Sequence, residues 1–244
     1  MVLIKDGPLG NELSEVLYKW RKKLGSKFRI VENAENLGLT ISLNKGLKIV
    51  KGDYIARMDS DDISTPLRFK LQKEFLDNHP DIAIVGGSLQ EFDSYHENLG
   101  VRHYPTTSEN VLDYIYKASP LAHPTVMMRR EIFDNGLSYN EKYPISQDIA
   151  LWFDVLKAGY KIANLNEITI KFRREGDVFR RRSKLKAKSE LKIYLNGIRR
   201  IYGLLTWRYI YPIARYCFRR MPVSIVRYFY GSNIRDKFLN RKVK

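Results

Sequence analysis

The chain has 244 residues, of which 44% are hydrophobic, and this is enough for one large domain with a substantial core. Its one cysteine, Cys217, excludes an internal disulfide, and the four scattered histidines argue against a zinc site. The formal net charge of +16 is unevenly distributed. Residues 171–244 hold 22 Lys and Arg against 4 Asp and Glu, whereas residues 1–170 hold 21 against 23. The basic excess therefore belongs to the last part of the chain, where it predicts an anionic partner.

The sequence shows no pattern typical of a signal peptide or of a transmembrane helix. The apolar start at residues 1–4 is too short for the hydrophobic part of a signal peptide. The most apolar late stretch, residues 201–218, is interrupted by Arg208 and Arg215. Since a membrane span needs ~20 mostly apolar residues, we expect no transmembrane helix. A single cysteine favours a reducing compartment, so we expect a cytoplasmic protein.

Hydrophobic periodicity predicts alternating strands and helices as far as residue 172. The first predicted helix has one apolar face, formed by Leu13, Val16, Leu17, Trp20 and Leu24. The expected strands are 2–4, 28–31, 53–57, 82–92, 124–128 and 168–172, and the expected helices are 11–24, 39–50, 66–78, 108–117 and 147–158. This alternation indicates an α/β fold, with a mostly parallel sheet and flanking helices.

Three carboxylates, Asp59, Asp61 and Asp62, follow directly after the predicted strand at residues 53–57. Carboxylates this close raise one another's pKa, which favours either a bound cation or exposure to water. Ligands of α/β sheets bind at the carboxyl ends of strands, where this loop lies. The spacing alone leaves two explanations, a divalent metal that carries a phosphate and a solvated acidic turn.

The character of the chain changes at Arg173. Arg180-Arg181-Arg182 and three lysines come first, and aromatic and aliphatic residues interleaved with Arg follow. Pro212 and Pro222 divide this extension into short helices. The composition fits helices lying on an anionic membrane, a helical cap packed on the domain, or a nucleic-acid surface. Because Trp and Tyr favour the membrane interface, we expect an anionic membrane surface as the partner and no nucleic acid.

Several short motifs occur in a fixed order along the chain. They are Asn36-x-Gly38, Asn44-Lys45-Gly46, Gly52-Asp53-Tyr54-Ile55, Asp59-Ser60-Asp61-Asp62, Pro66-x-Arg68 and, further along, Gln147-Asp148-Ile149-Ala150-Leu151-Trp152. In this order they resemble the family 2 glycosyltransferases, in particular the bacterial members that build exopolysaccharide and lipopolysaccharide. The resemblance implies a GT-A-like, Rossmann-like catalytic domain over residues 1–175 and a basic amphipathic helical extension over residues 176–244. Members of the family begin with a strand and loop that this chain does not match, so we expect a domain missing its N-terminal strand.

The resemblance also implies roles for individual residues. Asp61 and Asp59 match the D-x-D motif that binds Mn²⁺ or Mg²⁺, and oxygen ligands suit such a cation. Asp148 matches the general base, and its place at a helix start favours the ionised carboxylate. His123 and Trp152 are expected on the acceptor side, although a structural histidine fits His123 equally well. The residues expected around the nucleotide-sugar are Asp6, Asn36, Asp59, Asp62 and Arg68.

Arg57 is expected either to meet phosphate or to pair with the acidic loop. Arg173 and Arg174 match, more weakly, a basic loop that closes over the diphosphate.

The function implied by the resemblance is inverting transfer of a sugar from a nucleotide-diphosphate donor, a UDP-sugar, to a hydroxyl. The acceptor would be a growing polysaccharide or lipid-linked glycan, and the basic extension would hold the enzyme on the inner face of the cell membrane. The alternative is a catalytically degenerate, truncated remnant that acts only as a basic membrane- or nucleic-acid-binding protein. The donor sugar, the acceptor and the linkage are not specified by these motifs.

Overall fold

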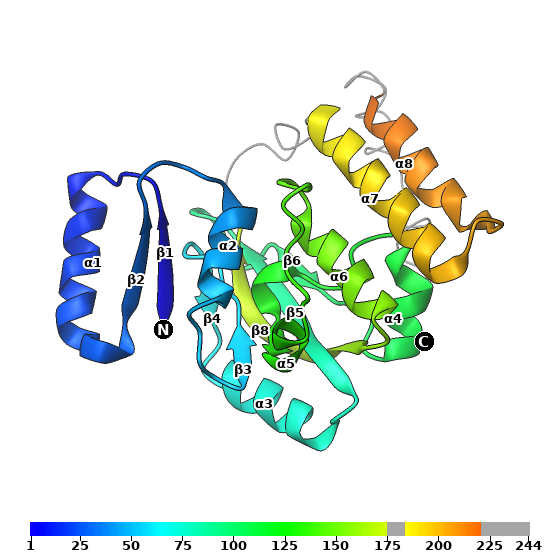
Figure 1. Cartoon of the computed structure of the whole chain (residues 1–244). Coiled ribbons are helices and arrows are strands. Elements are labelled where there is room, and N and C mark those ends of the chain that lie inside the picture. The colour runs from blue at the N-terminus through cyan, green and yellow to red at the C-terminus, as the bar shows by residue number, and fades with distance from the viewer. Residues whose placement is uncertain (175–183, 221–244) are drawn as a thin grey trace.

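The computed structural model describes residues 1–174 and 184–220 (Figure 1). The strands are β1 (Val2–Asp6), β2 (Arg29–Asn33), β3 (Tyr54–Ala56), β4 (Ile63–Ser64), β5 (Ile82–Phe92), β6 (Gly100–Arg102), β7 (Met127–Arg129) and β8 (Lys161–Arg173). The helices are α1 (Asn11–Leu24), α2 (Leu39–Leu47), α3 (Arg68–Asn78), α4 (Ser108–Ile115), α5 (Glu131–Asp134), α6 (Gln147–Lys157), α7 (Lys184–Tyr202) and α8 (Ile210–Arg220). Short 3₁₀ turns occur at Gly25–Lys27, His123–Thr125 and Trp207–Tyr209.

The central sheet has the strand order β3-β7-β5-β8-β4, with β6 paired to β5. The predicted α/β class with flanking helices is confirmed. The expectation of a mostly parallel sheet needs correction, because among the described strands only the β1–β2 and β5–β8 pairs are parallel and the other pairs are antiparallel. Strands β4, β6 and β7 have two or three residues each. Such short strands carry no periodic pattern from which a direction could be inferred.

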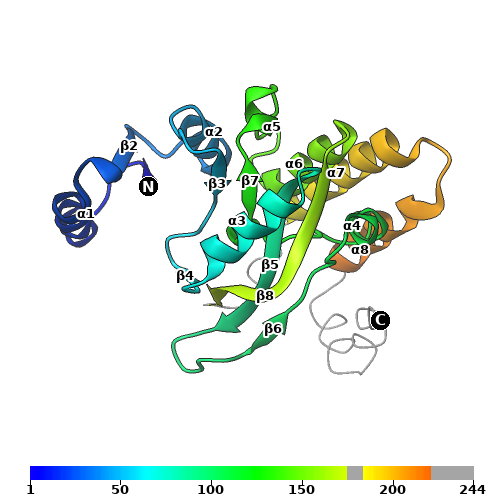
Figure 2. The same ribbon diagram turned by 90° about the horizontal axis from the view of Figure 1, so that it is seen from below.

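Two apolar clusters hold the central sheet between helices. On one face, Ile84 and Met128 of the sheet pack with α4 and with Leu151 and Trp152 of α6. On the other face, Leu76 of α3 packs on a smaller cluster of strand residues. Because β5 is covered on both faces, its first eight residues are all buried, and this explains their continuous apolar run. Figure 2 shows α3 lying across β5 in the view from below.

Helix α7 of the basic extension belongs to the same core. Its Ile193, Tyr194 and Ile198 are at most 2% exposed and join the cluster around α6. Gly197 allows the close approach, since a Cβ there would lie 2.2 Å from the Phe153 ring. Of the explanations left open for the extension, a helical cap packed on the domain therefore fits α7. The predicted features at residues 180–182 and at Pro222 lie outside the described residues.

None of the described helices combines the length and the apolar composition that a membrane span requires.

The N-terminal unit, formed by β1, α1 and β2, stands apart from the central sheet (Figure 1, left). Among the described residues β1 pairs only with β2, and β3 pairs only with β7. Helix α1 has the predicted bounds, yet none of its residues is buried. Leu13, Val16 and Trp20 are 57%, 46% and 46% exposed. The predicted apolar face is thus correct as a pattern but is left largely in solvent.

Candidate active site

The three carboxylates of the acidic loop converge where the chain leaves β3. One oxygen each of Asp59, Asp61 and Asp62 lies within 4.8 Å of the others. Asp61 is exposed, whereas Asp62 is buried and accepts a hydrogen bond from the backbone N–H of Arg173 at 2.9 Å. Burial raises the pKa of Asp62 to about 6 against that bond, and the charges of Asp59 and Asp61 add to the rise.

These residues fit a divalent cation. The Oδ2 atom of Asp62 is buried and has no hydrogen-bond partner among the described residues. A buried carboxylate oxygen without a partner is costly, and two further carboxylates stand beside it. Hard cations such as Mg²⁺ take oxygen ligands of this kind, and they favour the ionised carboxylate. Asp59, Asp61 and Asp62 would hold such an ion.

Arg57 connects the acidic loop to the rest of the site. Its guanidinium binds both carboxylate oxygens of Asp59, with Nη1 at 2.7 Å from Oδ2. Arg57 therefore pairs with the acidic loop, as one of the two expectations had it, and the contact with phosphate stays a prediction. The same charge also reaches Asp148 and His123 and acts to lower the pKa of both side chains.

Arg68 is buried and hydrogen-bonds the backbone next to the acidic loop. Its side chain is fully buried and donates to the backbone oxygens of Arg57 (2.8 Å) and Val126 (3.3 Å) and to Gln72 Oε1 (3.0 Å). Burial lowers its pKa to about 10, which leaves it charged. Arg68, in the first turn of α3, thus braces the loop through these contacts, and its expected nucleotide contact stays a prediction.

The Asp6 carboxylate is likewise hydrogen-bonded by groups of the chain itself. It accepts hydrogen bonds from Asn33 Nδ2 (2.8 Å) and from the backbone N–H groups of Leu37 (2.9 Å) and Gly38 (3.0 Å). Burial alone would raise its pKa, but these bonds outweigh it and hold the pKa of Asp6 below its usual range. The exposed Asn36 accepts from the N–H of Gly38 at 3.1 Å. Both residues thus shape the loop that follows β2.

Asp148 stands in the first turn of α6, half-buried. The residue before α6, Ser146, has a left-handed backbone (φ 62°), which is uncommon for a residue with a side chain and sets the entry into the helix. From the sequence, the helix start is expected to favour the ionised carboxylate of Asp148. Instead burial raises the pKa of Asp148, and the backbone N–H groups, Arg57 and Lys186 offset this only in part. The result is a stronger base than the helix position alone predicts.

The two residues expected on the acceptor side are both buried. His123 is 7% exposed, and its Nε2 lies 2.7 Å from the Tyr139 hydroxyl. Trp152 has no exposed surface and packs edge-on against the His123 ring. Burial, with Arg57 nearby, lowers the pKa of His123 well below its usual value, so the ring is neutral. The burial of His123 and its bond to Tyr139 fit the structural explanation, and the expected acceptor contact of either side chain stays a prediction.

Comparison with known proteins places this arrangement in a family. A model described as "Glycosyl transferase family 2" matches residues 1–137, more than half of the chain. The chain belongs to glycosyl transferase family 2. The transferase is 30% identical over 232 residues to the amylovoran biosynthesis glycosyltransferase of Erwinia amylovora, covering 94% of this chain and 85% of that protein. It is also 30% identical over 237 residues to an Escherichia coli galactosyltransferase, covering 96% and 85%. That enzyme is named for UDP-Gal and an α-D-GlcNAc-diphosphoundecaprenol acceptor.

Solved structures show that the transferase shares its fold with other glycosyltransferases. TarS 1–349 of S. aureus superposes with a TM-score of 0.62 at 18% identity, covering 99% of this chain and 66% of that one. A Pyrobaculum calidifontis mannosyltransferase, solved with GDP-Man and Mn²⁺, gives 0.60 at 12% identity and covers 96% and 70%. At these identities the likeness establishes the expected GT-A fold alone.

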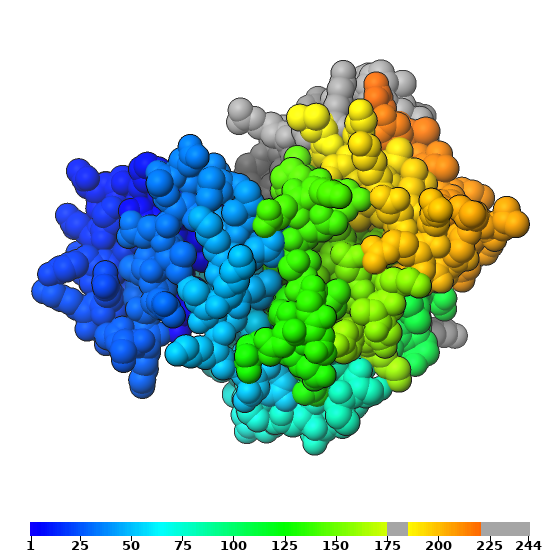
Figure 3. All heavy atoms as spheres, viewed as in Figure 1, coloured from blue at the N-terminus to red at the C-terminus, as the bar shows by residue number. Residues whose placement is uncertain are grey.

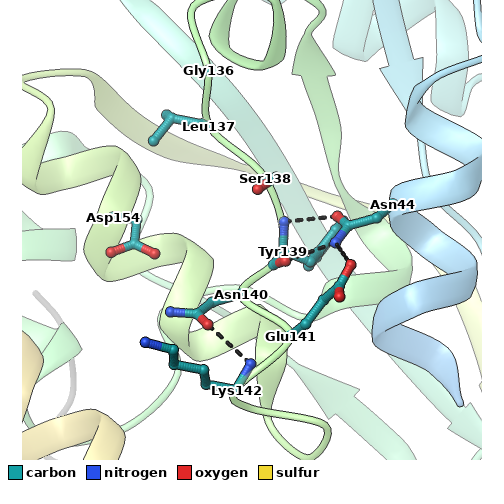
Figure 4. A pocket seen from close by; sticks show the side chains of 9 residues that line it. All are labelled: Asn44, Gly136, Leu137, Ser138, Tyr139, Asn140, Glu141, Lys142 and Asp154. Atoms are coloured by element: carbon teal, nitrogen blue, oxygen red, sulfur yellow. Dashed lines mark hydrogen bonds between the residues drawn. The ribbon is translucent and has the colours of Figure 1, made fainter.

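A surface hollow of about 420 Å³ lies between α2, the 136–142 loop and α6 (Figure 4). None of the predicted site residues lines it; its lining comes from Asn44, from residues 136–142 and from Asp154. Asn44 donates to the Tyr139 carbonyl (2.8 Å) and accepts from the Tyr139 N–H (3.0 Å). In the transferase the hollow therefore lies where α2 contacts the 136–142 loop.

Sequence reasoning missed two contributors to the site of the transferase. Tyr139 hydrogen-bonds His123, and Lys186 of α7 lowers the pKa of Asp148 through its charge. Tyr139 lies in a polar turn without a periodic pattern, and Lys186 lies in the extension that was interpreted as a membrane surface. Both meet the site only through folding, so the sequence carries no local signal for either.

Proposed function

We propose that the transferase is a metal-dependent, inverting glycosyltransferase that uses a UDP-sugar and a hydroxyl acceptor, with Asp148 as the general base. The observation that carries this proposal is the position of Arg57. It binds Asp59 of the acidic loop, and its charge acts on Asp148. This arrangement supports one common site for the predicted base and the carboxylates that would hold the cation.

On the donor side, Asp59, Asp61 and Asp62 would hold Mn²⁺ or Mg²⁺. The ion supplies charge neutralisation for the diphosphate as it leaves. Arg173 bonds the loop from the other side, through its N–H to Asp62 and its Nε to the Asp61 carbonyl (3.1 Å). Arg68 holds the Arg57 carbonyl from below. These contacts support the loop from two directions, which is the preorganisation that electrostatic stabilisation requires.

On the acceptor side, the Asp148 carboxylate takes the proton of the acceptor hydroxyl. The acceptor oxygen then forms the bond to the anomeric carbon while the bond from that carbon to the diphosphate oxygen breaks, so the configuration inverts. The raised pKa of Asp148 makes it a better proton acceptor than an exposed aspartate. For the acceptor we propose a lipid-linked or growing glycan, because the E. coli relative is named for a diphosphoundecaprenol acceptor.

Titration calorimetry with UDP and Mn²⁺ tests the donor side. We expect wild type to bind UDP in a Mn²⁺-dependent way and Asp61→Ala to lose at least about tenfold in affinity. The matched control is Asp53→Asn, an exposed aspartate just before β3, which should bind as wild type does. A wild-type protein without metal-dependent UDP binding would contradict the proposal and support the alternative of a non-catalytic binding protein.

Release of UDP from a panel of UDP-sugars tests the base. Asp148→Asn should retain UDP binding and lose turnover by about 10²- to 10⁴-fold, because it keeps the shape and removes the proton acceptor. The wild-type rate should fall on the acid side at a pH above about 4, the ordinary aspartate range, since burial raises the pKa of Asp148. An unchanged rate in Asp148→Asn would remove Asp148 from the mechanism.

A further inference from the structure

The turn between α7 and α8 forms an apolar projection, which we call the α7–α8 corner (residues 203–213). Leu205 is fully exposed, and Leu204 and Ile210 are 66% and 64% exposed. Trp207, Ile213 and Tyr211 are 55%, 48% and 40% exposed. Figure 3 shows this segment projecting at the right edge of the molecule, away from the N-terminal unit. Soluble surfaces rarely gather so many large apolar side chains in one short segment without a partner.

The corner is built to hold this shape. Gly203 ends α7 with a left-handed backbone (φ 82°), and its carbonyl accepts from the Tyr209 hydroxyl at 3.0 Å. The ring of Tyr116, the residue that follows α4, packs edge-on against Trp207 and Tyr211, with ring centroids 5.5 Å and 5.4 Å away.

The Arg208 guanidinium stacks over the rings on the inner side of the corner, 4.4 Å from the Tyr202 centroid. The inner rings are thereby fixed, and the leucines are held outward in a defined position.

The two helices that carry the corner are strongly basic, although the charge of Asp113 on α4 acts on Tyr202 at its inner side. Residues 184–220 contain ten Lys or Arg and a single acidic residue, Glu190, which binds Arg219. An apolar tip with Trp and Tyr at its base and cations around it matches a bilayer, in which acyl chains lie below an anionic headgroup layer.

We infer that the α7–α8 corner inserts into the surface of an anionic lipid bilayer, with Leu204 and Leu205 entering the acyl region. The composition of the whole extension predicts membrane contact through its charge and its aromatic residues. The inference confines this contact to one apolar corner, because α7 itself packs into the core. The inference does not rest on the proposed transferase chemistry, so either can fail alone.

Vesicle flotation of the full chain tests the inference. Wild type should float with vesicles of phosphatidylcholine containing about 30% phosphatidylglycerol and bind pure phosphatidylcholine more weakly. Leu204→Ser/Leu205→Ser should lower the partition coefficient by about tenfold or more, because two apolar side chains no longer leave water. The matched control, Tyr95→Ser/Leu99→Ser, removes exposed apolar residues at the β5–β6 turn and should float as wild type does.

Fluorescence locates the contact. In a Trp20→Phe background, Trp207 is the exposed tryptophan, since Trp152 is buried, and brominated lipids should quench it. The inference is overturned if wild type does not float, if the serine variant floats equally, or if floating protein leaves Trp207 unquenched. It is also overturned if light scattering shows a wild-type dimer that the serine variant splits without a change in flotation. Unchanged melting temperatures would confirm that the variants fold, as expected for exposed side chains.

Discussion

Helices α1 and α6 both carry an apolar stripe at helical spacing, but only α6 buries it. In α6 seven side chains are buried, among them Leu151 and Trp152 with no exposed surface. In α1 no residue is buried, and Leu13 is 57% exposed. The difference lies in the surface opposite each helix: α6 faces the six-stranded sheet and α7, whereas α1 faces a two-stranded sheet whose first strand is only half-buried. Periodicity determines that a helix forms, and the partner surface determines what the helix contributes to stability.

The largest effect expected from this contrast is in α6. Leu151→Ala should lower the free energy of unfolding by about 3 kcal/mol, because it leaves a cavity in a closely packed core. Urea denaturation followed by circular dichroism measures the change. A loss below about 1 kcal/mol would show that the core around α6 relaxes freely, and the contrast between the helices would then disappear.

A second variant tests whether α7 is part of that core. Gly197→Ala places a methyl group 2.2 Å from the Phe153 ring, so we expect a loss of about 1–3 kcal/mol from overpacking. Adding Phe153→Leu should restore part of the stability, since it makes room for the methyl group. If Gly197→Ala has no effect on the melting temperature, α7 does not pack on α6 as closely as the structure indicates.

Burial also gives the core a pH dependence that involves His123. Its pKa is lowered in the folded protein below the unfolded value of about 6.5, so the stability it contributes is complete above that pH. Below pH 6.5 the unfolded state binds the extra proton, and stability should fall by up to about 1.4 kcal/mol per pH unit. His123→Gln, which can still bond the Tyr139 hydroxyl, should flatten this slope. Equal slopes in both proteins, measured by denaturation between pH 7 and pH 5, would contradict the assignment.

The smallest effect is expected in the N-terminal unit. Trp20→Ala removes a large side chain that is 46% exposed and lies on no buried cluster. We expect a change of at most about 0.5 kcal/mol, within the range of surface substitutions. The same denaturation assay measures it, and a loss as large as that of Leu151→Ala would mean that α1 is covered in solution.

Local features of the chain were predictable from the sequence. The bounds of α1, the convergence of Asp59, Asp61 and Asp62, and the position of Asp148 at the start of α6 all follow from neighbouring residues. The place of the acidic loop can be predicted from the strand before it and the helix start after it. The family motifs are also local, so their order along the chain was enough to indicate the family.

Side chains whose partners lie far along the chain could not be predicted in this way. Arg68 donates to the carbonyl of Val126, and His123 bonds the hydroxyl of Tyr139. A polar residue in a family motif can either bind a ligand or hydrogen-bond the chain's own backbone. Which of the two it does depends on its partners in the folded chain. The directions of the short strands escaped prediction because pairing, not periodicity, sets them.

Asn44 illustrates what this means for the motifs themselves. Its amide exchanges both hydrogen bonds with the backbone of Tyr139, as one residue of an antiparallel pair does with its neighbour. Aspartate lacks the donor for the Tyr139 carbonyl, and it would also face Glu141, to which the Asn44 amide donates at 3.0 Å. In Asn44-Lys45-Gly46, the asparagine side chain therefore hydrogen-bonds as a strand backbone does and joins α2 to a distant loop. A residue of an enzyme's sequence motif can thus hold the folded chain together and need not take part in the chemistry.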